Sequence, residues 1–387
     1  MTILQIVPSY KPAFVYGGPI YSISALCEAQ AALGHQVVVF TTNANGSRSL
    51  EVPLEAIQTI NKVDVIYFPR ITGDHTHISP KLWLQLFKDV KKYDVIHLHS
   101  WWSVLMIGCA WILKLKGIRF VFSPRGMFSN YSFNHNINPI KKGIFFGLLT
   151  RPVLEKQIFH ATAPSEAIEI KELFGQESQV FTLPNLLQFP TLSLYAIESH
   201  QDRQTINLLF ISRVDRKKGI ELLLKAVQLL KRENLSIHLT MVGSGNDDYI
   251  NELKNLVESL NITEIVEWKG SVEWKAKFDD ILYADILVLP SYNENFANII
   301  LETLYAGRPV ILTKYVGLCD YVSANKMGWV IDTNPQDIVV AVKEYQVNKL
   351  KWQAKSIEMH NQVLTDFNQT VLAEKYISHY KEILNPS

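Results

Sequence analysis

Two glutamates, Glu294 and Glu302, lie eight residues apart in segment 287–309, which reads L-V-L-P-S-Y-N-E-N-F-A-N-I-I-L-E-T-L-Y-A-G-R-P. The apolar start predicts a strand. The apolar residues after the polar turn predict a helix that Gly307 ends and Pro309 does not allow to continue. In a parallel α/β sheet, the turn after a strand lies at the carboxyl edge, where ligands bind. One carboxylate in the turn and another about 12 Å along a helix could hold two parts of an elongated ligand, such as a sugar and a ribose.

The backbone of the same turn predicts a phosphate site, because Asn295, Phe296 and Ala297 would present their amides at a helix N-terminus. Glutamates are common on helices, so two of them at this spacing can also occur by chance. The context is more specific, since A-G-R-P-V then leads into a further predicted strand at 310–312.

Basic residues follow another predicted strand, in I-S-R-V-D-R-K-K-G. Arg213 can make bidentate contacts to phosphate and Lys218 can add a compact positive charge, so both suit a diphosphate. Arg216 and Lys217, between them, are interpreted as a solvated basic turn.

A double glycine, Gly17 and Gly18, follows the first predicted strand in Y-G-G-P-I-Y-S. It removes side chains where a phosphate must approach, and Pro19 suits the first turn of a helix. The pattern is not G-x-G-x-x-G, and no acidic residue ends the second strand, which argues against a nicotinamide-dependent dehydrogenase.

Two histidines lie in D-V-I-H-L-H-S-W-W, where strand alternation places His97 and His99 on the same face. His99 is nearer the carboxyl edge and is the candidate site residue, whereas His97 is interpreted as a core histidine. No Asp-x-Asp motif or His/Glu cluster accompanies them, so no metal site is predicted. Arg125, in the turn S-P-R-G-M at the same edge, is predicted to contact donor or acceptor. A structural salt bridge is the alternative.

Strands and helices alternate along the chain, which is typical of parallel sheets built by right-handed crossovers. Strands are predicted at 3–7, 36–41, 63–68, 94–98, 119–122, 180–183, 206–212, 237–242, 265–268, 285–289 and 310–312. Helices are predicted at 19–33, 80–91, 103–116, 165–174, 219–235, 247–260 and 363–384. Segment 187–204 breaks the alternation with Pro, Ser and polar residues and is interpreted as a linker.

The composition excludes several classes of protein. A chain of 387 residues is too long for one typical core and fits two domains. Lys plus Arg number 38 against 37 Asp plus Glu, which argues against a nucleic-acid binder that relies on bulk charge. The 3 cysteines are scattered, which suits a reducing cytoplasm, and the N-terminal residues lack the features of a signal peptide.

Segment 138–152 combines Lys141, Lys142 and Arg151 with a dense apolar run. Basic and apolar surfaces of this kind bind anionic bilayers, so peripheral contact with the inner face of the membrane is one interpretation. The other is a helix packed on its own domain. No run of ~18 apolar residues indicates a spanning helix.

Together these segments resemble the retaining glycosyltransferases of family 4, and S-P-R-G-M resembles a subset that acts in surface-polysaccharide assembly. The resemblance implies the GT-B fold: two doubly wound, parallel-sheet (Rossmann-like) α/β domains that face each other across a cleft. The acceptor-side domain would occupy 1–190 and the donor domain 205–362, while the helix within 363–387 would cross back to the first domain.

The resemblance also implies the roles of the candidate residues. Arg213 and Lys218 would stabilise the leaving diphosphate, Glu294 would hold sugar hydroxyls, Glu302 the ribose, and His99 would lie near the reactive carbon of the sugar. The remaining candidates would contact the donor, and they are Gly17, Gly18, Arg125, Gly243, Lys269, Asn295, Phe296 and Ala297.

The implied activity is transfer of a hexose from a UDP- or GDP-sugar to a saccharide or lipid-linked saccharide, with retention of configuration and without a metal or other cofactor. Two alternatives remain: a sugar-nucleotide epimerase of the same fold, and a nucleotide-sugar binding module without turnover. Ala297 departs from the family pattern, in which Gly or Pro is frequent. Gly317 is single where the family more often has Gly-Gly followed by Glu.

Overall fold

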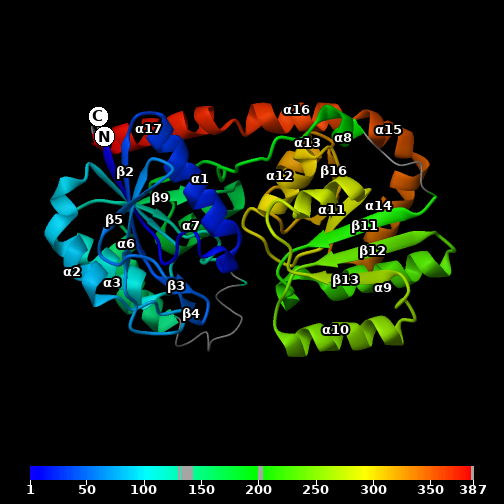
Figure 1. Cartoon of the computed structure of the whole chain (residues 1–387), viewed down its shortest axis with the longest axis horizontal. Coiled ribbons are helices and arrows are strands. Elements are labelled where there is room, and N and C mark those ends of the chain that lie inside the picture. Colours follow the sequence, from blue (N-terminus) through cyan, green and yellow to red (C-terminus); the bar gives the residue numbers. More distant parts are fainter. Residues whose placement is uncertain (130, 132–142, 199–203, 385–387) are drawn as a thin grey trace. The chain divides into compact units, whose positions relative to one another are not determined.

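The computed structural model describes residues 1–129, 131, 143–198 and 204–384 (Figure 1). The chain forms two compact units. Unit 1 comprises Met1–Gln188 and Phe367–Ser387, and unit 2 comprises Phe189–Asp366.

The described part of unit 1 contains an eight-stranded sheet with the strand order β10-β9-β8-β7-β1-β2-β6-β5. All neighbouring pairs are parallel except β5 with β6. The strands are β1 (Thr2–Ile6), β2 (Gln36–Thr42), β5 (Ile57–Ile60), β6 (Val63–Phe68), β7 (Val95–His99), β8 (Val121–Ser123), β9 (Ile158–Ala161) and β10 (Val180–Thr182). A separate antiparallel pair joins β3 (Ala44–Asn45) and β4 (Arg48–Ser49).

Helices cover both faces of this sheet, so its central strands read as nearly continuous apolar runs. The helices are α1 (Gly18–Ala32), α2 (Pro80–Asp89), α3 (Val104–Leu115), α6 (Arg151–Leu154), α7 (Pro164–Phe174) and α17 (Gln369–Leu384), with short turns η1 (Phe14–Tyr16), η2 (Val90–Lys92) and η3 (Phe146–Thr150). Although α1 and α17 come from opposite ends of the chain, they pack side by side (Figure 1).

The described part of unit 2 contains a parallel six-stranded sheet with the order β13-β12-β11-β14-β15-β16. The strands are β11 (Ile206–Ile211), β12 (Ile237–Val242), β13 (Val266–Gly270), β14 (Ile286–Leu289), β15 (Val310–Thr313) and β16 (Gly328–Ile331). The helices are α8 (Leu194–Glu198), η4 (Arg216–Lys218), α9 (Ile220–Arg232), α10 (Asp247–Ser259), α11 (Lys277–Tyr283), α12 (Asn298–Tyr305), α13 (Cys319–Ala324), α14 (Pro335–Val347), α15 (Lys349–Ala354) and α16 (Ser356–Asp366).

Two doubly wound, Rossmann-like α/β units confirm the predicted fold class, and most predicted elements agree with the observed ones to within a few residues. Two predicted elements differ from the observed ones. The predicted linker 187–204 contains the boundary between the units, after Gln188, but it also contains helix α8, which packs in unit 2. The predicted helix 363–384 is two helices, because the Asn368 side chain accepts a hydrogen bond from Val371 N (3.1 Å) and caps a new start.

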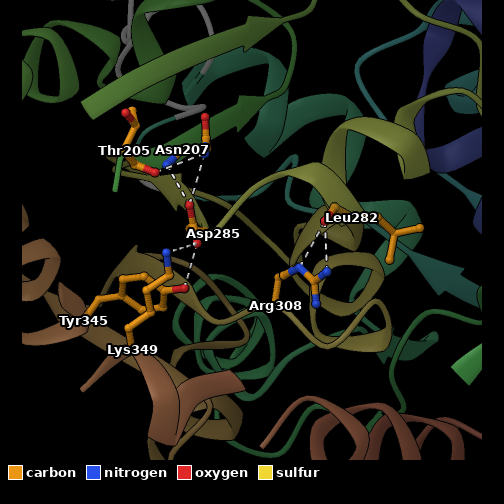
Figure 2. Close-up of polar contacts among 7 residues, drawn as sticks. All are labelled: Thr205, Asn207, Leu282, Asp285, Arg308, Tyr345 and Lys349. Atoms are coloured by element: carbon orange, nitrogen blue, oxygen red, sulfur yellow. Dashed lines mark hydrogen bonds and ion pairs between the residues drawn. The ribbon is translucent and has the colours of Figure 1, made fainter. Parts of the chain in front are cut away.

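A buried carboxylate, Asp285, fixes the start of β14 (Figure 2). Its Oδ2 accepts hydrogen bonds from the Asn207 backbone amide (2.8 Å) and side-chain amide (3.2 Å). Its Oδ1 accepts from the Tyr345 hydroxyl (2.9 Å), and the Lys349 ammonium lies 3.9 Å away. This carboxylate therefore ties β11 and β14 to α14 and α15.

A buried guanidinium, Arg308, fixes the chain just before β15 (Figure 2). Its Nε and Nη2 donate to the Leu282 carbonyl (3.3 and 2.9 Å), and its Nη1 donates to the Ile197 carbonyl (2.8 Å). Leu282 and Ile197 lie in the last turns of α11 and α8, where a cation interacts favourably with the helix dipole. Arg308 thus holds these helices beside the amino end of β15, at the sheet edge opposite the one from which the Glu294 turn leaves β14.

Candidate active site

The turn that carries Glu294 leaves the carboxyl end of β14 in an extended conformation. Glu294 forms an isolated parallel bridge with Val316. Its amide donates to the Tyr315 carbonyl (2.9 Å), and its carbonyl accepts from the Gly317 amide (2.9 Å). Because these bonds keep the turn extended, α12 begins only at Asn298. The predicted separation of two helical turns between Glu294 and Glu302 was therefore wrong.

The residues between Glu294 and α12 form a tight connection. Asn295 and Phe296 both interact with neighbouring residues, and the Phe296 side chain is buried. Ala297 is the N-cap and has φ 65° and ψ 76°, which is the left-handed region. Whether their amides bind phosphate stays a prediction.

In unit 2, the turn after β11 lies close against the turn after β14. Gly219 has φ 62°, and a Cβ on it would collide with the Pro290 carbonyl oxygen. The amide of Tyr292 donates to the carbonyl of Lys217 (2.8 Å), which joins the same two turns. Glycine is required at 219 both for its backbone conformation and for this contact.

This approach brings the side chains of Lys218 and Glu294 into an ion pair. Their side chains are 12% and 13% exposed, so the pair is largely withdrawn from water. This ion pair connects the basic segment that follows β11 with the acidic turn that follows β14. Only one carboxylate oxygen, Glu294 Oε1, is engaged with the ammonium.

Two further cations accompany this pair. Arg213 is 71% exposed, and its guanidinium lies 3.8 Å from the Asp215 carboxylate. Lys217 was interpreted as solvated, but it is partly buried. Burial lowers the pKa of Lys217, Glu294 opposes that effect, and the charges of Lys218 and Arg213 add to it.

The sequence analysis therefore missed Lys217 as a site residue. Its neighbour Arg216 does lie at the surface, where it pairs with Glu252 (2.5 Å) and stacks over Tyr249. The short helix η4 turns these adjacent cations in different directions.

Glu302 lies on α12 in a second buried ion pair, with Lys277 at the start of α11 (2.7 Å). Its side chain is 6% exposed. Lys277 is 25 residues away along the chain, and no local motif marked it as a partner. Within the described part of the chain, Glu302 Oε2 has no hydrogen-bond partner and remains available to a ligand.

Gly243 and Lys269 both have structural roles within unit 2. A Cβ on Gly243 would collide with the Ser212 carbonyl, so glycine is needed where β11 and β12 end. The Lys269 ammonium donates to Asp280 Oδ1 (2.6 Å), and this hydrogen bond raises the pKa of Lys269. Contact of either residue with a nucleotide base stays a prediction.

We expect Ala297→Gly to stabilise the protein, because alanine in the left-handed region costs roughly 1–2 kcal/mol. The greater freedom of glycine in the unfolded chain offsets about 0.4–1 kcal/mol of this. A net gain of ~1 kcal/mol should raise the unfolding temperature of a unit of this size by roughly 2–4 °C. Ala306→Gly is the control. Because Ala306 has an ordinary φ of −77°, this change should lower the unfolding temperature. A loss of stability in both variants would contradict the inferred strain.

In unit 1, the double glycine begins α1 after β1. Gly17 has φ 69° and caps the helix, and Gly18 is its first residue. A Cβ built on Gly17 meets nothing within 4 Å, so the space beside it is open. This confirms the predicted helix start and leaves room for a ligand group.

His99 lies fully buried at the end of β7. Its Nε2 hydrogen-bonds to Gln5 Oε1 (2.6 Å), and its Nδ1 faces Arg125 Nε at 3.2 Å. An amide oxygen only accepts and a guanidinium only donates, so the ring is neutral with its proton on Nε2. Burial holds the pKa of His99 well below its usual range, and the charges of His97 and Arg125 act in the same direction. The geometry therefore shows that His99 orients Arg125, while its predicted position near the reactive carbon of the sugar stays a prediction.

His97 belongs to a separate buried chain, which confirms its interpretation as a core histidine. The chain runs from the Tyr380 hydroxyl to His97 Nδ1 (2.7 Å), from His97 Nε2 to Ser123 Oγ (2.6 Å), and from Ser123 Oγ to His160 Nδ1 (2.6 Å). His160 Nε2 then donates to the Leu183 carbonyl (2.9 Å). Because that carbonyl only accepts, it determines the direction of every bond in the chain.

Arg125 lies in the left-handed region (φ 53°) after β8. Besides His99, its guanidinium contacts Ser22 Oγ (3.1 Å) and Asn185 Oδ1 (2.8 Å) through Nη1. No carboxylate pairs with it among the residues that the structure describes, which removes the structural salt bridge as an explanation.

Two family models match adjacent parts of the chain. The model described as Glycosyltransferase Family 4 matches residues 16–187, and the one described as Glycosyl transferases group 1 matches residues 197–358. The two units described above are therefore those of a glycosyltransferase with the GT-B fold. The chain belongs to glycosyltransferase family 4, as the resemblance indicated.

Individual proteins agree with this assignment. D-inositol 3-phosphate glycosyltransferase of Pseudarthrobacter chlorophenolicus is 27% identical over 342 residues, covering 82% of this chain and 78% of that protein. The putative colanic acid biosynthesis glycosyltransferase WcaL of Escherichia coli is 26% identical over 186 residues, covering 45% and 44%. The structure of Anabaena HepE in complex with UDP-glucose has a TM-score of 0.74 and 16% identity, covering 99% of this chain and 100% of that one.

Proposed function

We propose that the protein transfers a hexose from a UDP- or GDP-sugar to a saccharide or lipid-linked saccharide in cell-surface polysaccharide synthesis, with retention of configuration. The Lys218–Glu294 pair carries this proposal, since it places cations and a carboxylate together at the carboxyl ends of β11 and β14. The named role of WcaL supports the polysaccharide class, and the UDP-glucose bound to HepE makes a UDP-sugar the first donor to test.

In this proposal the cations of the site stabilise the leaving diphosphate. Arg213, Lys217 and Lys218 place positive charge where negative charge develops as the glycosidic bond breaks. An ammonium has three N–H donors, so Lys218 can hold Glu294 and a phosphate oxygen at the same time.

The two glutamates hold different parts of the donor. Glu294 has Oε1 on Lys218 and offers Oε2 to sugar hydroxyls, while Glu302 offers Oε2 to the ribose. The other proposed donor contacts are Gly17, Gly18, Arg125, Gly243, Lys269, Asn295, Phe296 and Ala297. In unit 1, His99 contributes by orienting Arg125.

An assay with UDP- and GDP-sugars, with and without a lipid extract, tests the proposal. A glycosyltransferase releases nucleotide only when an acceptor is supplied, apart from slow hydrolysis. An epimerase of the same fold would release free sugar without an acceptor, and a binding module would bind donor without turnover. NMR of the product's anomeric carbon then tests retention.

We expect activity to survive EDTA. Arg213, Lys217 and Lys218 supply the positive charge that a divalent cation provides in metal-dependent transferases, where carboxylates hold the metal against the diphosphate. Nucleotide release should therefore be unchanged after chelation and dialysis. Loss of activity with EDTA, restored by one divalent ion, would contradict this expectation.

We propose that a surface of unit 1 contacts the anionic inner face of a membrane. Exposed apolar side chains on α2, α3 and η3 include Phe87, Leu115 and Leu148. The Lys116 ammonium lies 3.3 Å from the centroid of the Phe87 ring, which places a cation among them. Lys141 and Lys142, on which the sequence interpretation relied, lie outside the described residues. None of the described helices is long and apolar enough to span a bilayer.

Leu115→Glu should weaken binding to phosphatidylglycerol vesicles at least ~10-fold, because burying a leucine contributes roughly 1.5–3 kcal/mol. Binding is measured by co-sedimentation, and neutral phosphatidylcholine vesicles should bind less well because the attraction is partly electrostatic. Ile57→Glu changes an exposed side chain on β5 and is the matched control. Equal binding by both variants would contradict the assigned surface.

A further inference from the structure

Arg125 is a cation whose protein partners are all neutral. The guanidinium donates to His99 Nδ1, Ser22 Oγ and Asn185 Oδ1. His99 is neutral because its Nδ1 accepts from the guanidinium and so carries no proton, while its Nε2 donates to the Gln5 amide oxygen. None of these three acceptors is a carboxylate, so the guanidinium is hydrogen-bonded without a direct ion pair among the residues that the structure describes.

Burial lowers the pKa of Arg125 and the charge of Glu166 opposes that effect, while Glu166 also hydrogen-bonds to other residues. Its Oε1 accepts from the Gly126 amide (2.5 Å), and its Oε2 accepts from the amide (2.7 Å) and hydroxyl (3.1 Å) of Thr162. These bonds hold the S-P-R-G-M turn against α7. The Glu166 side chain is itself buried, so it is committed to that role.

The free part of the guanidinium is Nη2. In the described part of the chain it has no hydrogen-bond partner, while Nε and Nη1 are fixed by three contacts. A partly buried charge without a counter-ion in direct contact is costly, and buried charges in proteins are normally paired. Here the guanidinium is oriented in advance, and one edge of it is left for a ligand.

We propose that Arg125 is the anchor of an anion subsite in unit 1, which binds a phosphate or carboxylate group of a substrate. This rests on the proposed glycosyl transfer and adds the class of group that is recognised. Guanidinium donors match the geometry of such oxyanions. The same chemistry has two possible sources: the diphosphate of the donor, or an anionic group on the acceptor.

Calorimetry with inorganic phosphate and with UDP tests the proposal on the full chain. Phosphate should bind the wild type at least about tenfold more tightly than Arg125→Gln, since a charge-assisted hydrogen bond is lost. Arg119→Gln is the matched control, because Arg119 is an exposed arginine before β8 that bonds to Gln179 (2.8 Å), and it should bind phosphate as the wild type does.

The UDP titrations identify the source of the anion. If the donor diphosphate occupies the subsite, Arg125→Gln weakens UDP binding and saturating UDP displaces phosphate. If an acceptor group occupies it, UDP binding is unchanged and phosphate still binds the UDP-saturated wild type in an Arg125-dependent manner. Both outcomes support the subsite. Unchanged binding of both phosphate and UDP by folded Arg125→Gln overturns it.

Should Arg125→Gln fail to fold, the wild type provides the readout. The Nε–H resonance of Arg125, identified by its loss in Arg125→Lys, should shift on addition of phosphate, and no shift would overturn the proposal. Nucleotide release from UDP-sugars is measured in parallel. Activity without an Arg125-dependent anion site would remove this inference and leave the proposed transfer intact.

Discussion

Arg213→Ala is expected to lower turnover at least ~100-fold and to leave the unfolding temperature unchanged. Loss of one preorganised donor to a developing negative charge costs about 2.7–4 kcal/mol in the transition state. The fold should not depend on Arg213, because the side chain is 71% exposed and its ion pair with Asp215 is long. Exposed pairs of this kind contribute little to stability.

Lys218→Ala should lower turnover as much, but with some loss of stability, because it leaves the largely buried Glu294 without its partner. Lys225→Ala removes an exposed lysine from α9 and is the control for both variants. Turnover and thermal unfolding are measured on the same preparations. Near-normal turnover in both Arg213→Ala and Lys218→Ala would remove the diphosphate contact from the mechanism.

Glu294→Gln and Glu302→Gln should have different effects. If Glu294 holds sugar hydroxyls more tightly as the bond breaks, Glu294→Gln depresses turnover more than donor binding. If Glu302 binds ribose equally in both states, Glu302→Gln weakens UDP binding about tenfold to a hundredfold, since such a hydrogen bond contributes roughly 1.5–3 kcal/mol. Calorimetry with UDP separates the two because UDP has a ribose but no sugar.

The stability of the two glutamate variants can be compared as well, by thermal unfolding. Glu302→Gln leaves Lys277 in a buried site without a full counter-charge, so it should also lower the unfolding temperature. Glu258→Gln, an exposed change on α10, is the control. UDP binding weakened equally by Glu294→Gln and Glu302→Gln would show that the two roles are wrongly divided.

Much of the fold could be predicted because its signals are local. Strands β6 and β12 were predicted with their observed bounds, since apolar runs and turn residues lie within a few positions of each other. Strands β5 and β16 and helix α14 were missed. Strand β16 has a mixed pattern of burial at the sheet edge, so its sequence alone does not distinguish it from a loop.

The sequence by itself determined the two α/β units and the turns at their strand ends, and it predicted Arg213, Lys218 and Glu294 as candidate site residues in those turns. Only the tertiary structure decided how side chains are paired, because pairing depends on contacts between distant segments. Lys277 meets Glu302 across 25 residues and Tyr380 meets His97 across 283. The same packing partly buried Lys217 beside the exposed Arg216, and it gave Arg125 neutral hydrogen-bond acceptors.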